Sequence, residues 1–277
     1  MPKLGLDIDQ YLRTEVLPTV WCPGCGNGNI VEGIGTAFQR IGLDPEKVVV
    51  VGGIGCSGRT PFYVRTNAMH TTHGRALAYA TGLKMANPEL TVVVTMGDGD
   101  ALAIGGNHFI HAARRNVDLT AIVYNNGIYG MTGGQGAPTT PVGSRTTTSL
   151  LGAVERTFDT VELALAAGAS YVARTTTFDM QEIPLRIEEA LRHKGFSLVE
   201  VLTQCPTYYG RLNRIGDPSD MLIWERDHTA DEPVTLLSRE EMVGPLRTGV
   251  FRNEEDPEYI EVYREMCAAQ GGSYAAG

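Results

Sequence analysis

The chain has 277 residues, and its 32 acidic and 23 basic side chains give a formal net charge of −9. A hydrophobic fraction of 43% and a charged fraction of 20% are typical of folded globular proteins and exclude disorder as the main state. The excess of acidic residues argues against nucleic-acid binding. No apolar run approaches the roughly 20 residues of a membrane span, and residues 1–16 lack the apolar core of a secretion signal. We therefore expect a cytoplasmic protein with no nucleic-acid or membrane partner.

Strand-like and helix-like segments alternate along the chain. The expected elements, in chain order, are a helix at residues 27–41, a strand at 47–51, a helix at 74–86, a strand at 91–96, a helix at 103–115, a strand at 119–124, a helix at 161–167, a strand at 170–174, a helix at 180–193, a strand at 196–202 and a helix at 258–269. Near-continuous β-branched strands are typical of a parallel sheet buried on both faces. The order predicts an α/β fold, a doubly wound and mostly parallel sheet, with ligands at the carboxyl ends of its strands.

Polar loops follow two successive predicted strands. Asp98 stands in the run Gly97–Asp100, directly after the strand at 91–96, and Asn126 follows the strand at 119–124. Carboxylate and amide oxygens suit Mg²⁺ or Ca²⁺, and Mg²⁺ usually binds a few protein oxygens together with substrate phosphates. The sequence therefore predicts a cation and phosphate site at one edge of the sheet. Residues 126–150, rich in Gly, Thr and Pro, predict a functional loop beside it.

The chain has five cysteines, at positions 22, 25, 56, 205 and 267. Cys22 and Cys25 form a C-x-x-C pair, whereas Cys56 and Cys205 each follow a predicted strand, so these four thiols can converge at the same sheet edge. A thioredoxin-like motif is disfavoured because no strand pattern precedes Trp21. Spacing alone leaves a structural zinc site, an iron–sulfur cluster and independent buried thiols open. We expect Cys267, in the last helix, to be a packing residue.

Several motifs together resemble a known family. Gly97-Asp98-Gly99 followed by Asn125-Asn126 resembles the diphosphate-binding signature of thiamine-diphosphate enzymes. The segment 129–135 (YGMTGGQ), together with WCPGCGNG, GIGCS, HGRA and CPTYYGRLN, resembles the β subunits of 2-oxoacid:ferredoxin oxidoreductases over about residues 15–225. The resemblance implies a thiamine-diphosphate-binding fold with iron–sulfur ligands over residues 1–225 and a C-terminal extension over 226–277.

The same resemblance assigns ligands and contacts to individual residues. It implies that Asp98, Asn126 and the main-chain carbonyl of Ile128 hold Mg²⁺, and that Cys22, Cys25, Cys56 and Cys205 hold a [4Fe–4S] cluster. It further implies that thiamine diphosphate is contacted by Ile54, Gly55, Cys56, Ser57, His73, Gly99, Asp100, Gly130, Met131 and Thr132. His73 is expected to donate to phosphate or to assist proton movement. We also hypothesise that Arg59, three residues after Cys56, pairs with the carboxylate of the substrate.

The activity implied by the resemblance is oxidative decarboxylation of a 2-oxoacid with coenzyme A to an acyl-CoA and CO₂, with ferredoxin as electron acceptor and reversible with reduced ferredoxin. The segment 205–213 (CPTYYGRLN) is more similar to 2-oxoglutarate members, although pyruvate and branched-chain 2-oxoacids stay open. The carboxylate that activates the aminopyrimidine is expected on an α subunit, which implies an (αβ)₂ assembly. The alternatives are a non-oxidative thiamine-dependent decarboxylase or synthase with structural zinc, and a non-catalytic phosphate- or nucleotide-binding module.

Overall fold

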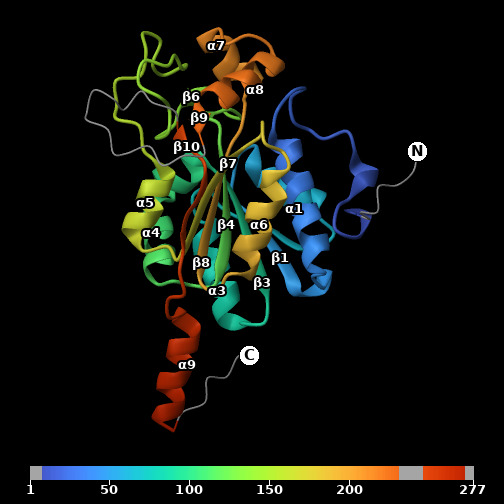
Figure 1. Ribbon diagram of the computed structural model, residues 1–277, viewed down its shortest axis with the longest axis vertical. Helices are drawn as coiled ribbons and strands as arrows, with labels where there is room; N and C mark the ends of the chain where they lie inside the picture. Colours follow the sequence, from blue (N-terminus) through green and yellow to red (C-terminus); the bar gives the residue numbers. More distant parts are fainter. Residues whose placement is uncertain (1–7, 231–245, 272–277) are drawn as a thin grey trace.

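The computed structural model describes residues 8–230 and 246–271 (Figure 1). The first seven residues of the chain, part of the predicted C-terminal extension and most of the final tail therefore lie outside the described residues. Within the described ranges, no helix is long and apolar enough to cross a membrane.

Seven strands of the described chain form one sheet, in the order β11-β7-β8-β4-β3-β1-β2. All neighbouring pairs are parallel except β11 with β7. The strands are β1 (Val48–Gly52), β2 (Asn67–His70), β3 (Thr91–Gly97), β4 (Leu119–Asn125), β7 (Tyr171–Thr176), β8 (Phe196–Leu202) and β11 (Gly249–Asn253). The predicted α/β fold with a mostly parallel sheet is confirmed.

Helices cover both faces of this sheet (Figure 1). One face carries α1 (Asn27–Ile41) and α6 (Glu182–Arg192), and the other carries α3 (Ala76–Ala86), α4 (Gly106–Arg114) and α5 (Thr160–Ala167). Helix α9 (Tyr259–Ala269) extends from the bottom of the molecule in Figure 1. Further helices and strands of the described chain are α2 (Thr60–Tyr63), the pair β5 (Ile128–Tyr129) and β6 (Gln135–Gly136), α7 (Arg211–Asn213), α8 (Pro218–Asp227), and the pair β9 (Thr229–Ala230) and β10 (Leu246–Arg247).

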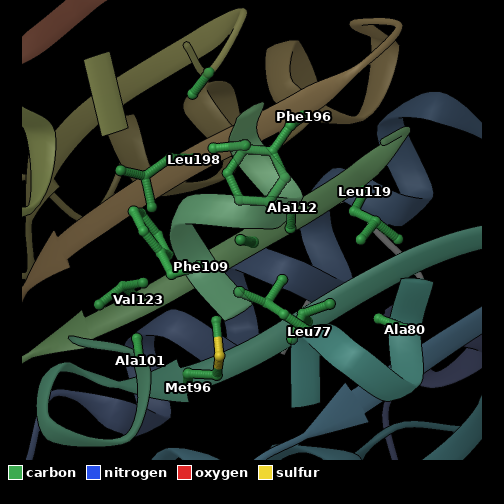
Figure 2. Close-up of a cluster of buried hydrophobic side chains, with 14 of the residues drawn as sticks. Leu77, Ala80, Met96, Ala101, Phe109, Ala112, Leu119, Val123, Phe196 and Leu198 are labelled. Atoms are coloured by element: carbon green, nitrogen blue, oxygen red, sulfur yellow. The ribbon is translucent and has the colours of Figure 1, made fainter. Parts of the chain in front are cut away.

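The core has two halves because successive residues of a strand point to opposite faces. In β3, Val92 and Val94 pack under α3 and α4, whereas Val93 packs under α1. Figure 2 shows the first half, where the Phe109 and Phe196 rings meet edge to face with centroids 5.9 Å apart. Burial on both faces explains why the strand sequences are continuously apolar rather than alternating.

Several parts of the fold differ from the sequence prediction or were not foreseen. The helix predicted at 103–115 begins later, at Gly106, because a π-helical turn at Asp100–Ile104 precedes it. The edge strands β2 and β11 were not predicted, because their partly exposed residues lack a continuous apolar pattern. Helix α8 was also missed, although a capping box of Asp217 and Asp220 begins it. β11 lies in the predicted C-terminal extension yet adds to the main sheet, and the boundary at residue 225 stays a prediction.

Candidate functional site

A cleft with a volume of about 150 Å³ opens at the carboxyl edge of the sheet. Register explains why predicted residues meet there: Gly97 at the end of β3 pairs with Tyr124 near the end of β4, so Asp98 and Asn126 follow at the same level. The predicted residues that line the cleft are Ile54, Gly55, Cys56, Ser57, His73, Asp98, Gly99, Asp100, Asn126, Ile128, Gly130, Met131 and Thr132. Their binding roles stay predictions.

Asp98 is a nearly buried carboxyl group, 2% exposed, with no cationic partner among the described residues that act on it. Thr139 Oγ1 donates a short hydrogen bond to its Oδ2, and the backbone N–H groups of Gly99 and Gly127 face the same carboxyl group. Burial nevertheless raises the pKa of Asp98 from 3.8 to about 6. A desolvated carboxylate without a counter-charge is suited to bind a cation.

Asp100 ties two loops of the cleft together. Its Oδ2 accepts the N–H of Ile54 at 3.3 Å, and its Oδ1 accepts the N–H of Gly74 at 2.7 Å and lies 2.5 Å from His73 Nδ1. The Cβ of any larger residue in place of Gly53 would lie 1.7 Å from Asp100 Oδ2, which explains a glycine at that position. Asp100 was predicted as a cofactor contact; the structure gives it this loop-joining role as well.

Asn126 and Ile128 lie in the turn that leaves β4. The side-chain Oδ1 of Asn126 accepts the N–H of Ile128 at 3.2 Å, and the neighbouring Asn125 Oδ1 accepts the N–H of Gly127 at 3.2 Å. Asn125 is itself held by the buried Glu200, whose Oε1 accepts its Nδ2 at 2.7 Å. The turn that carries both predicted magnesium ligands is therefore anchored to β8.

The four predicted thiols lie near one another, and Cys56 among them lines the cleft. Cys22, Cys56 and Cys205 are close enough to Cys25 to disfavour its ionisation. A Cβ on Gly130 would lie 3.4 Å from the Sγ of Cys205 and 3.9 Å from that of Cys56, so a glycine here leaves room beside both sulfurs. Cys22 is exposed, and the other three are partly buried.

Burial acts on these thiols in the direction opposite to metal binding. It raises the pKa of Cys25 to about 12 and that of Cys56 to about 11, with the neighbouring thiols adding to the effect. Burial also raises the pKa of Cys205. In the described ranges, no three His, Cys, Asp or Glu side chains are arranged to hold a single metal ion. Cys267 lies apart from the four thiols, in α9, as expected.

Arg59 does not line the cleft. It is exposed, at the end of the 3-10 turn that follows Cys56, and its positive charge acts on the Cys56 thiol. His73, by contrast, lines the cleft, and its ring meets that of Tyr129 edge to face at 6.1 Å. Of the two residues predicted to be catalytic, His73 therefore lies at the cleft and Arg59 does not.

Sequence reasoning missed residues that support or line the site. Trp21 Nε1 donates to the carbonyl of Cys56 at 2.8 Å, so the C-x-x-C segment is tied to a cysteine loop 35 residues away. Thr139 holds Asp98 from the loop at 126–150, and the Tyr129 hydroxyl donates to the carbonyl of Gly99 at 3.1 Å. Asn27 lines the cleft beside the thiols. The only sequence signal for these residues was their proximity to the motifs.

The donor chemistry of the cleft fits the groups that the sequence predicts. Its lining offers a buried carboxylate without a cation and an amide, as a hard cation requires, together with the Cys56 thiol, which lies near the three other thiols. Three buried polar atoms in the cleft, Asn27 Nδ2, Asn27 Oδ1 and Ser57 Oγ, have no hydrogen-bond partner. These are features of a site shaped for a polar ligand rather than for packing.

Comparisons with known proteins point in one direction. Residues 53–201 match the family model "Thiamine pyrophosphate enzyme, C-terminal TPP binding domain". The chain is 55% identical over 256 residues to the 2-oxoglutarate synthase subunit KorB of Archaeoglobus fulgidus, covering 92% of each protein. It is 40% identical over 268 residues to the 2-oxoacid:ferredoxin oxidoreductase subunit beta of Saccharolobus solfataricus, covering 92% of this chain and 87% of that protein.

The fold is similar to a solved structure as well. The 2-oxoglutarate:ferredoxin oxidoreductase from Magnetococcus marinus, with 2-oxoglutarate, coenzyme A and succinyl-CoA bound, superposes with a TM-score of 0.86 at 34% identity. The match covers 97% of this chain and 92% of the chain of that enzyme.

Proposed function

The chain belongs to the β subunits of the 2-oxoacid:ferredoxin oxidoreductases, and we propose that it takes part in the oxidative decarboxylation of 2-oxoglutarate with coenzyme A, yielding succinyl-CoA and CO₂. The observation that carries the proposal is the meeting of two donor sets at one cleft. Asp98 and Asn126 line this cleft together with Cys56, and the Cys56 thiol lies near the three other thiols.

Mg²⁺ and thiamine diphosphate fit the oxygen donors of the cleft. Asp98, Asn126 and the carbonyl of Ile128 would hold the metal, and the metal would offset the desolvated charge of Asp98. The loop-joining contacts of Asp100 hold the segments after β1 and before α3 together, and these segments would contact the diphosphate. The glycines of the cleft let the backbone approach the cofactor.

A [4Fe–4S] cluster is the group that we propose for the four thiols. Four thiolates can hold either a tetrahedral zinc ion or such a cluster, so the cysteines alone do not choose between the two. The similarity of the chain to 2-oxoacid:ferredoxin oxidoreductases supports the cluster, because these enzymes pass electrons to ferredoxin and zinc has no redox chemistry. We therefore favour the oxidoreductase over a non-oxidative decarboxylase with structural zinc.

The residues of this chain bind and orient the reactants. When bound, thiamine diphosphate supplies the carbanion chemistry that decarboxylation needs, and the cluster supplies one-electron acceptance. His73 can exchange a proton with a group bound in the cleft, while Asp100 holds the Nδ1 atom of its ring. Trp21 holds the C-x-x-C segment against Cys56 and so keeps the thiols near the cofactor. Coenzyme A then takes the acyl group.

2-Oxoglutarate is proposed as the substrate because the Archaeoglobus relative is named for it and the Magnetococcus enzyme was solved with it bound. Family membership as a β subunit implies an α subunit, and we extend this to an (αβ)₂ assembly that delivers electrons to ferredoxin. We keep Arg59 as the proposed partner of the substrate carboxylate. Arg59→Ala should then raise the KM for the 2-oxoacid strongly while cofactor affinity persists, and an unchanged KM would refute this role.

The decisive experiment is a substrate panel on the anaerobically reconstituted two-subunit enzyme, with ferredoxin or a viologen as electron acceptor. We expect 2-oxoglutarate to give the largest kcat/KM, a CoA requirement, and a brown protein with broad absorption near ~400 nm from thiolate-bound iron. A preference for pyruvate or a branched-chain acid would correct the substrate. Colourless protein with stoichiometric zinc and no acceptor reduction would favour the non-oxidative alternative.

A further inference from the structure

Asn27 is a buried amide with no hydrogen-bond partner, placed where the two halves of the site meet. It is the first residue of α1, two positions after Cys25, and it is among the residues that line the cleft. Only 1% of the residue is exposed, and neither Nδ2 nor Oδ1 finds a partner. Most buried polar side chains in native proteins are paired, so an amide with both ends unpaired requires a specific explanation.

The packing around Asn27 leaves the amide little freedom to find a protein partner. Its own backbone N–H faces the Cys25 thiol. A Cβ on the preceding Gly26 would lie 2.2 Å from Thr203 Oγ1 and 2.7 Å from Gln204 Oε1, so the start of α1 is wedged against the end of β8. The helix therefore fixes the backbone of Asn27, and the side chain remains at the wall of the cleft.

The end of α1 adds a second reason for a polar, negatively charged ligand. α1 has 15 residues, and its first-turn N–H groups and its dipole give the end beside Asn27 a partial positive charge. The first turn of this helix contains no acidic side chain that would offset that charge. A carboxamide offers one donor group and one acceptor. An oxygen-rich anion can accept from the donor, and a water molecule on the metal that accompanies the anion can donate to the acceptor.

We propose that the Asn27 side chain hydrogen-bonds the diphosphate end of Mg²⁺–thiamine diphosphate in the cleft and so adds a binding residue to this site. The inference rests on the proposed function for the identity of the ligand. It assigns Asn27 to cofactor binding rather than to support of the thiols, which its backbone N–H already provides at Cys25.

The test uses the full chain purified with its α subunit, and Asn27→Leu removes the amide at nearly constant volume. The affinity for Mg²⁺–thiamine diphosphate should fall by roughly tenfold or more, as expected for a lost hydrogen bond to a charged group. The unfolding temperature without cofactor should stay equal or rise, because the variant removes two unpaired buried atoms. Asn27→Asp keeps the shape but adds a negative charge, and should weaken binding further.

Gln39→Leu is the matched control. Gln39 lies near the other end of α1, its Oε1 is also buried without a partner, and it does not line the cleft. This variant should leave cofactor affinity unchanged. Wild-type affinity in Asn27→Leu overturns the inference, and so does loss of bound iron with cofactor affinity intact, because the amide would then serve the thiols. A wild-type complex that does not bind Mg²⁺–thiamine diphosphate would instead overturn the proposed function.

Discussion

Glu225 should make the stability of the chain depend on pH. It lies on α8, 4% exposed, and joins the ends of β7 and β8 through Thr177 and Gln204. Thr177 Oγ1 lies 2.9 Å from Glu225 Oε2 and 2.6 Å from Gln204 Oε1. Since Thr177 has one hydroxyl proton for two acceptors, a neutral Glu225 that donates to Thr177 satisfies the whole group. Burial accordingly raises the pKa of Glu225 from 4.5 to about 8.

The sign and the size of the effect follow from that pKa. Between pH 4.5 and pH 8 the folded chain keeps a proton that the unfolded chain releases, so stability falls as pH rises through this window. At about 1.4 kcal/mol for each tenfold change in acidity, the ionised group costs at most about 5 kcal/mol above pH 8. Glu225→Gln resembles the neutral acid, because its amide can donate to Thr177 and accept the N–H of Phe178.

The assay is urea unfolding of the full-length chain and of Glu225→Gln at a series of pH values from 4 to 9. The variant should match the wild type near pH 4 and exceed it by several kcal/mol near pH 9. Glu189→Gln, in a half-exposed ion pair with Arg186, is the control and should shift stability by about 1 kcal/mol or less. Parallel pH curves for Glu225→Gln and the wild type would refute the assignment of a neutral buried acid.

Three further predictions concern the supports of the cleft. Glu200→Gln leaves the buried Arg174, bonded to Glu200 at 2.5 Å, without that counter-charge. Urea unfolding should show that the free energy of unfolding falls by about 3 kcal/mol, and a fall of less than about 1 kcal/mol would contradict this prediction. Gly53→Ala must displace the carboxylate of Asp100, so the titrated affinity for Mg²⁺–thiamine diphosphate should fall, whereas unchanged affinity would show that the loops hold without this contact. Asp98→Asn removes a carboxyl group with a pKa of about 6 and should raise the metal-free stability at pH 8 by up to about 3 kcal/mol. The unfolding temperature of this variant should no longer depend on Mg²⁺. An unfolding temperature that still rises with Mg²⁺ would show that Asp98 is not a ligand of the metal.

The sequence was sufficient to predict the sheet edge where the site lies. The central strands carry β-branched runs such as Val92–Val94. Because both faces of these strands are buried, the runs are continuous rather than interrupted by polar residues, and they are easy to recognise in the sequence. Once these strands are parallel, topology brings Asp98 and Asn126 to one edge without any knowledge of side-chain packing. The structure brings residues of these loops to one cleft, and their binding roles stay predictions.

Other features depend on contacts that a linear pattern does not encode. Thr139 reaches Asp98 across 41 residues, and Trp21 reaches Cys56 across 35. The π-helical turn at Asp100–Ile104 begins at Asp100, whose carboxylate accepts the N–H groups of Gly74 and Ile54 from other loops. The edge strands β2 and β11 are specified by pairing partners rather than by their own composition.

The unpaired groups of the cleft share one physical property that links binding to stability. Asp98 is a buried carboxyl group without a cation, Asn27 is a buried amide without a partner, and the pKa values of Cys25 and Cys56 are raised by burial. Asp98 and Asn27 cost folding free energy in the chain alone, and the proposed metal and diphosphate would relieve that cost, whereas the buried thiols stay protonated and would lose their protons on binding iron. Because a ligand that binds only the folded chain stabilises it by mass action, the loaded chain must be more stable than the chain alone. Desolvation makes these residues unfavourable without ligands, and it would also make their interactions with the cofactors strong. The reason is that the low dielectric of the cleft strengthens both the penalty for an unpaired polar group and the attraction between paired ones.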